Sequence, residues 1–131
     1  MMRWANLIKY HLNAPSRNVL VRHPIVQSNY ELHKQQNRPL DKYITEKYLR
    51  NKLNWLITDN KFPYYLDGSI KHKVLWIKPH LSMNEQIIHK IINRYAKAHG
   101  YNKYIYYENP VEARSIPGIR HYHIFVDTQK H

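Results

Sequence analysis

Cysteine is absent from the 131-residue chain, and glycine and acidic residues are scarce. The lack of cysteine excludes disulfides, thiolate zinc sites and cysteine nucleophiles. With only three glycines, the chain has no glycine-rich loop to cradle a phosphate. No apolar run approaches the roughly 20 residues that a membrane span needs, and the polar N-terminal stretch is unlike a secretory signal. We therefore expect a soluble intracellular protein, cytoplasmic or nuclear, with no membrane partner.

Positive charge is present in excess. Twenty-one Lys and Arg against nine Asp and Glu give a formal charge of +12, and there are ten histidines. This balance favours an anionic partner, either a phosphorylated small molecule or nucleic acid. Asn, Lys, Ile and Tyr are all abundant, as an AT-rich coding sequence would make them, so coding bias is the alternative explanation.

The first fifty-odd residues show the spacing of helices. The stretch RWANLIKYHL sets Trp4, Leu7 and Leu12 on one helical face. Pro24 and Pro39 each suit the first turn of a following helix. These patterns predict a helical N-terminal half.

From residue 70 the pattern becomes strand–helix–strand–loop–strand. Residues 70–78, 103–107 and 121–126 alternate or are rich in β-forming residues, which predicts three strands. The fold class is therefore α+β, with the helical N-terminal half packed on a small β-sheet in a single domain, 1–131. A right-handed crossover would make the first two of these strands parallel if they share the sheet.

The stretch 81–100 predicts the longest helix. Ser82 and Glu85 have the spacing of a capping box, and Gly100 suits the helix end. The expected buried stripe consists of Ile87, Ile88, Ile91, Ile92 and Tyr95.

Two histidines stand two residues apart in the last strand. Because side chains alternate along a strand, His121 and His123 point to one face and Tyr122 to the other. His72 opens an earlier strand in the same way. Long loops, 59–70 and 108–119, lead into these strands, so we expect the three imidazoles to line one concave site closed by the loops.

Motifs around these histidines resemble the N-acetylglucosamine-induced protein family, whose fungal members share a domain of unknown function. The resemblance is strongest over residues 59–126, and its matching positions are Asn60, Phe62, Pro63, Tyr64, His72, Trp76, Asn109, Ser115, Gly118, His121 and His123. The resemblance implies a fold and the position of a site, and it implies no reaction.

Three interpretations of the histidines remain open. They line a pocket for a phosphate-containing or sugar-nucleotide-like ligand, with catalytic roles for His72, His121 and His123 if phosphoester chemistry occurs there. They hold a divalent metal through His121 and His123. Or they serve only to fix the loops. The other candidate ligand-binding residues are Asn60, Tyr64, Trp76, Lys78, Asn109, Arg114 and Ser115.

A second function class depends on the long helix. Lys90, Arg94 and Lys97 form a stripe opposite its isoleucines, and tyrosines lie among further basic residues nearby. Such a surface suits single-stranded nucleic acid through phosphate contacts and base stacking. The alternative is therefore a non-catalytic nucleic-acid-binding protein, and the sequence does not decide whether the chain is an enzyme.

Overall fold

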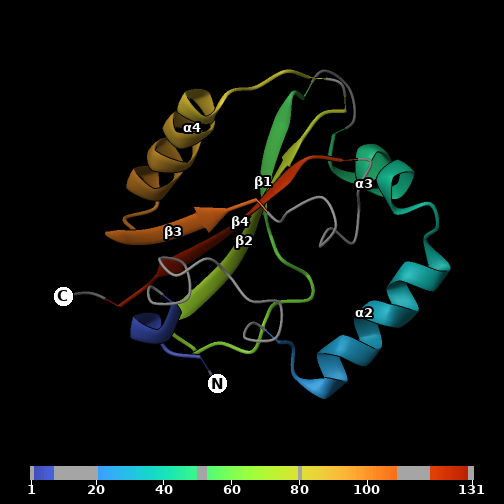
Figure 1. Cartoon of the computed structure of the whole chain (residues 1–131), viewed down its shortest axis with the longest axis horizontal. Helices are drawn as coiled ribbons and strands as arrows, with labels where there is room; N and C mark the ends of the chain where they lie inside the picture. The colour runs from blue at the N-terminus through green and yellow to red at the C-terminus, as the bar shows by residue number, and fades with distance from the viewer. Residues whose placement is uncertain (1, 8–20, 50–52, 80, 109–118, 130–131) are drawn as a thin grey trace.

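The computed structural model describes residues 2–7, 21–49, 53–79, 81–108 and 119–129. After a helical turn at residues 4–7, its elements are α2 (Pro24–Gln36), α3 (Leu40–Tyr48), β1 (Trp55–Asp59), β2 (Ile70–Ile77), α4 (Glu85–Ala98), β3 (Lys103–Tyr107) and β4 (His121–Asp127). The helix α4 lies on one side of the sheet, and α2 and α3 lie on the other (Figure 1). The predicted α+β arrangement is confirmed.

The four strands form one sheet in the order β1-β2-β4-β3, with every neighbouring pair antiparallel. Because β2 and β3 are each antiparallel to β4, they run in the same direction, as the crossover through α4 predicted. They do not pair with each other, since β4 lies between them.

The sequence prediction missed the strand β1, because it expected helices over the first fifty-odd residues and the first strand at residue 70. The segment WLITD pairs with β2 along its whole length, from Trp55 opposite Ile77 to Asp59 opposite Lys73. Trp, Ile and Thr are strong β-formers, but a five-residue strand at the end of a helical region leaves only a short pattern to detect.

The helix α4 begins later than the predicted capping box. Its N-cap is Asn84 rather than Ser82, and the Asn84 side chain accepts a hydrogen bond from the Ile87 amide at 2.9 Å. Asn and Ser cap equally well, so the sequence did not separate them. The helix ends before Gly100, whose φ of 73° lies in the left-handed region that favours glycine.

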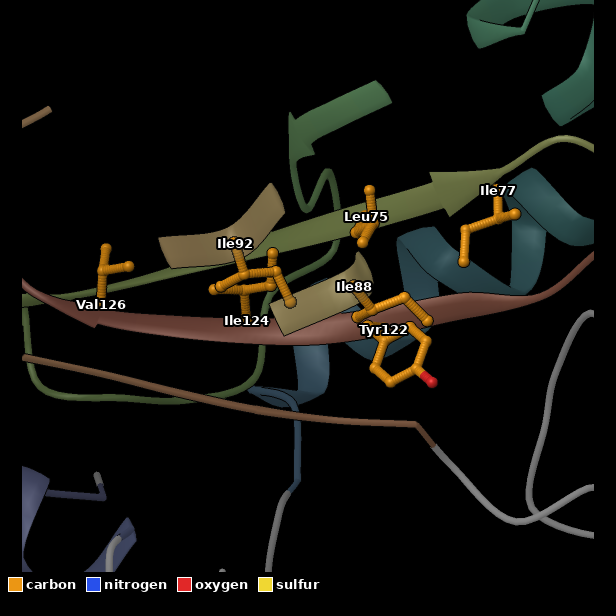
Figure 2. Packing of buried hydrophobic residues seen from close by; sticks show 7 residues of the cluster. All are labelled: Leu75, Ile77, Ile88, Ile92, Tyr122, Ile124 and Val126. Atoms are coloured by element: carbon orange, nitrogen blue, oxygen red, sulfur yellow. The ribbon is translucent and has the colours of Figure 1, made fainter. Parts of the chain in front are cut away.

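An aliphatic core fills the space between α4 and the sheet. Figure 2 shows its members converging from α4, β2 and β4: Ile88, Ile92, Leu75, Ile77, Tyr122, Ile124 and Val126. The alternation predicted for Tyr122 is confirmed, since it lies on this face. For Ile87 the prediction of a buried helical stripe is wrong, since this residue is 44% exposed.

The other face of the sheet is covered by α3 and the N-terminal segment. Val74 and Trp76 of β2 pack against Ile44 of α3. Leu7 packs against Phe125 of β4. The strands β2 and β4 are therefore buried on both faces, and the even-numbered positions of β2 lie on this second face.

Within the part of the chain that the structure describes, no helix has the length and apolar character needed to span a bilayer.

Candidate functional site

Three buried imidazoles form a row across β2 and β4 on the sheet face opposite α4. The Nε2 atom of His72 lies 2.8 Å from Nδ1 of His123, and the rings of His123 and His121 have centroids 5.6 Å apart. Their exposed fractions are 5%, 5% and 6%. The expected proximity of His72 to the His121/His123 pair is confirmed, and the three residues are called the histidine row below.

Backbone groups bond to the two ends of the histidine row. The Tyr64 amide donates to Nδ1 of His72 at 3.2 Å, and Nε2 of the same ring lies 3.2 Å from the Asn60 amide nitrogen and 2.8 Å from Nδ1 of His123. At the other end, Nδ1 of His121 lies 3.1 Å from the Ile119 carbonyl, which can only accept. A neutral His121 therefore donates its Nδ1 proton to this carbonyl.

Burial keeps two of these rings neutral. It lowers the pKa of His72 well below its ordinary value, and the neighbouring His123 and Arg22 lower the pKa further. Burial likewise lowers the pKa of His123 to about 3, with added effects from His121 and Arg22. At neutral pH, His72 and His123 are therefore uncharged hydrogen-bonding groups.

Aromatic rings surround the histidine row. Tyr64 stacks on His72 with centroids 4.8 Å apart and lies 5.6 Å from His123. Trp76 lies 5.2 Å from His121, and Tyr107 lies 5.6 Å from His123. This packing limits ring rotation, so the direction of each imidazole hydrogen bond is largely fixed.

Arg22 brings positive charge to this side of the sheet. Its guanidinium lies over the rings of Tyr30 and Tyr64, with Cζ 4.0 Å and 5.0 Å from their centroids. Its Nε donates to the Phe62 carbonyl at 2.7 Å, which ties the segment just before α2 to the loop after β1. Sequence reasoning missed Arg22 because the contact joins residues 40 positions apart.

The predicted ligand-binding residues are only partly brought together. Asn60 and Tyr64 lie against His72, and the Asn60 amide nitrogen is 3.2 Å from its Nε2. Trp76 lies beside His121 but donates its indole N–H to Thr58 within the fold. Lys78 follows the last residue of β2, and its side chain is exposed. Asn109, Arg114 and Ser115 lie outside the described residues.

Metal binding by His121 and His123 stays a prediction. Among the described residues, no group of three or more histidine or acidic side chains is placed to hold a metal ion. One nitrogen of His123 is already used by the bond from His72.

The predicted basic stripe is on the other side of the sheet. Lys90, Arg94 and Lys97 are all exposed on α4. The buried histidine row and the exposed basic stripe are thus separate, on opposite faces of the sheet.

The fold is similar to that of a solved structure. The crystal structure of a protein named HTC1 matches with a TM-score of 0.67, covers 97% of this chain and 85% of that chain, and is 17% identical in sequence. At this identity the match supports the fold alone.

Sequence comparisons confirm the resemblance found in the motifs. N-acetylglucosamine-induced protein 1 of Candida albicans (strain SC5314 / ATCC MYA-2876) is 27% identical over 81 residues, which take in 51% of this chain and 32% of that protein. The chain thus spans about a third of the length of this curated relative. A family model described as "Protein of unknown function (DUF3605)" matches residues 3–127, a range that contains the whole histidine row. The chain therefore belongs to the DUF3605 family.

Proposed function

We propose that this protein binds a small phosphate-containing molecule, such as a sugar nucleotide, against the histidine row. The proposal rests on one observation: three buried imidazoles stand side by side, in contact with one another and with the backbone of Tyr64 and Ile119. A row of imidazoles supplies both donors and acceptors along one wall.

Neutral imidazoles suit the binding of a phosphate group. A neutral imidazole donates one hydrogen bond and accepts another, so the row can contact both phosphoryl oxygens and sugar hydroxyls. In the enzymatic form of this proposal, His121 is the general base that activates water for phosphoester cleavage. Arg22 and the net charge of +12 favour an anionic ligand.

The decisive experiment is a thermal-shift and native mass-spectrometry screen of the purified protein. The probes are inorganic phosphate, a nucleoside diphosphate sugar, N-acetylglucosamine phosphate (chosen from the name of the Candida relative) and divalent metal ions. A ligand at about 100 times its Kd stabilises the folded state by about 2.7 kcal/mol, which is a measurable rise in Tm. Phosphate release from the bound probe tests the enzymatic form.

Two variants assign any stabilisation to the histidine row. His123→Ala removes the central imidazole and should abolish the ligand-dependent rise in Tm. His89→Ala is the matched control, because His89 is exposed on α4 on the other side of the sheet and should leave the rise unchanged. An unshifted parent protein with every probe, or equal shifts in both variants, rejects the proposal.

A second candidate function is nucleic-acid binding through α4. It is supported by the exposure of Lys90, Arg94 and Lys97 together on one side of this helix. Affinity for a single-stranded oligonucleotide should then fall steeply with salt, because each neutralised phosphate releases counterions. Replacing the three residues by alanine should flatten that dependence, and absence of binding at low salt rejects this candidate.

A further inference from the structure

We propose that the open edge of β1, together with the adjoining side of α4, is a docking surface for an extended segment of a partner protein. The segment carries apolar side chains at alternate positions and acidic residues at its flanks. This β1–α4 surface consists of Leu53, Trp55, Ile57, Ile87 and Ile91. It is independent of the proposed ligand site, because it lies at the sheet edge and on the opposite face from the histidine row.

The backbone of β1 offers hydrogen-bonding groups along its outer edge. The Asn60 amide donates to the His72 carbonyl at 2.9 Å, and the Lys78 amide donates to the Asn54 carbonyl at 2.9 Å. In an antiparallel pair, hydrogen-bonded positions alternate, so the even-numbered residues of β1 bond to β2. The amide and carbonyl groups of Trp55, Ile57 and Asp59 therefore point outward, and no described residue bonds to them.

Large apolar side chains are exposed beside this edge. Trp55 is 38% exposed, Leu53 is 45% exposed and Ile87 is 44% exposed. Such exposure is unusual for a strand edge, which proteins commonly protect with charges, proline or a covering element. An added strand would cover these side chains and pair with the outward backbone groups in one step.

The helix and the strand run together along this edge. At one end, Tyr95 of α4 interacts with Lys73, which forms an ion pair with Asp59 of β1. Ile91 and Ile57 pack against the same core. From Ile91 to Ile87 the helix rises about 6 Å, and from Ile57 to Trp55 the strand rises about 6.8 Å. Because these two distances are similar, Ile87 lies near the level of Trp55.

Cationic side chains lie on α4 beside Ile87, and their charge determines the chemistry of the occupant. His89 and Asn93 contact Tyr106 and Tyr104 of β3 at 3.1 Å and 3.0 Å. Their side of the helix therefore faces β3, at the other edge of the sheet from β1. Lys90, Arg94 and Lys97 are exposed. Lys90 and Arg94 stand three and seven positions after Ile87, which places them along its flank. This pattern suits acidic residues next to apolar ones.

The same charge argues against a second copy of this chain as the occupant. Two-fold pairing of β1 with β1 would bring identical cationic stripes of α4 towards each other. Each chain also carries a net charge of +12. A partner segment with acidic flanks relieves this repulsion.

The test is a selection from a displayed library of random peptides of about 12 residues, long enough to pair with β1 and reach past both ends. Enriched sequences are then synthesised and their affinities measured by fluorescence anisotropy. The double variant Trp55→Thr/Ile87→Gln removes apolar surface without changing charge. Leu32→Gln is the matched control, because Leu32 is 52% exposed on α2, away from β1.

We expect enriched peptides with alternating apolar residues and acidic flanks. The double variant should weaken binding about tenfold or more, as loss of a buried aromatic anchor does, while the control should bind as the parent does. Hydrogen exchange at the Trp55 and Ile57 amides should slow when the peptide binds.

Three outcomes overturn the proposal. One is that the library yields no enrichment, or peptides that bind the double variant as well as the parent. Another is a concentration-dependent dimer of the parent that the double variant loses, since that result assigns the surface to a second copy. The third is a single-stranded oligonucleotide that binds the parent and is weakened by the double variant, since this assigns the surface to nucleic acid. The ligand screen on the histidine row is unaffected by each of these results.

Discussion

On the face of the sheet covered by α4, the buried residues of β2 and β4 include Leu75, Ile124 and Val126 and are almost entirely aliphatic. On the other face, the same two strands bury His72, His121 and His123 among aromatic rings. Both faces exclude water to a similar degree, so burial alone does not explain the difference in composition.

The two faces differ in what they require of each residue. An aliphatic face needs correct volume and tolerates any side chain that fills it. A buried imidazole needs a partner for its polar atoms, and an unmade hydrogen bond there costs free energy. The α4 face therefore stabilises the fold with few constraints on which apolar residues it contains. The histidine face requires particular side chains with particular hydrogen-bond partners, which makes it the better candidate for a functional site.

The largest effect should come from the aliphatic face. Ile124→Ala removes a side chain with 0% exposure from the core beneath α4 and should lower the free energy of unfolding by about 2–5 kcal/mol. Urea denaturation of the parent and the variant measures the change. A cost below about 1 kcal/mol would show that the core collapses around the deletion, and the contrast between the faces would then fail.

A smaller effect is expected on the histidine face when the ring is kept and its nitrogens are removed. His72→Phe preserves the stacking with Tyr64 but removes the hydrogen bonds that join His72 to the Tyr64 amide and to Nδ1 of His123. We expect a loss of about 1–3 kcal/mol, the cost of unsatisfied buried polar groups. Urea denaturation again measures it, and His33→Phe, on a half-buried ring of α2, is the control. A fully stable His72→Phe protein would mean that the rings serve only as packing.

The histidine face should also make stability depend on pH. The pKa of His123 is about 3 in the folded protein and about 6.5 when unfolded, so the unfolded state binds more protons between these values. The stabilisation is complete above about pH 6.5 and is lost as the pH falls towards about 3, at up to about 1.4 kcal/mol per pH unit for this one group.

Comparison with a variant isolates this contribution. His123→Asn cannot titrate, so its stability should fall less steeply than that of the parent when urea denaturation is repeated between about pH 6.5 and 5, above the range of most carboxyl groups. Equal slopes in the two proteins would contradict a neutral, buried His123.

The face assignments were the most predictable part of the structure. Alternation along β4 correctly separated His121 and His123 from Tyr122, because a strand has a fixed period of two. The approach of His72 to His123 followed from the position of each residue near a strand start after a long loop. For these residues, local sequence patterns were enough to predict the face of the sheet on which each side chain lies.

Contacts between distant segments were not predictable in the same way. Arg22 reaches Phe62 through the packing of α2 on the loop after β1, and no local pattern records that contact. The strand β1 depends on its pairing with β2, since its own five residues are too few to show a period. The identity of a bound ligand depends on shape and charge that the motifs do not specify.

The smallest effect should come from the one isoleucine of α4 that was wrongly expected to be buried. The sequence places Ile87 and Ile88 in one stripe, but Ile87 is 44% exposed and Ile88 is 0% exposed. Ile87→Ala should therefore change the free energy of unfolding by no more than about 0.5 kcal/mol, whereas Ile88→Ala should cost about 2–5 kcal/mol. Alanine also favours helix slightly over isoleucine, which offsets part of the small loss at the exposed site. Urea denaturation of the two variants provides a matched pair within one helical turn. A large cost at Ile87 would mean that its side chain is covered in solution, as it would be if a second copy occupied the β1–α4 surface, and the cost would then rise with protein concentration.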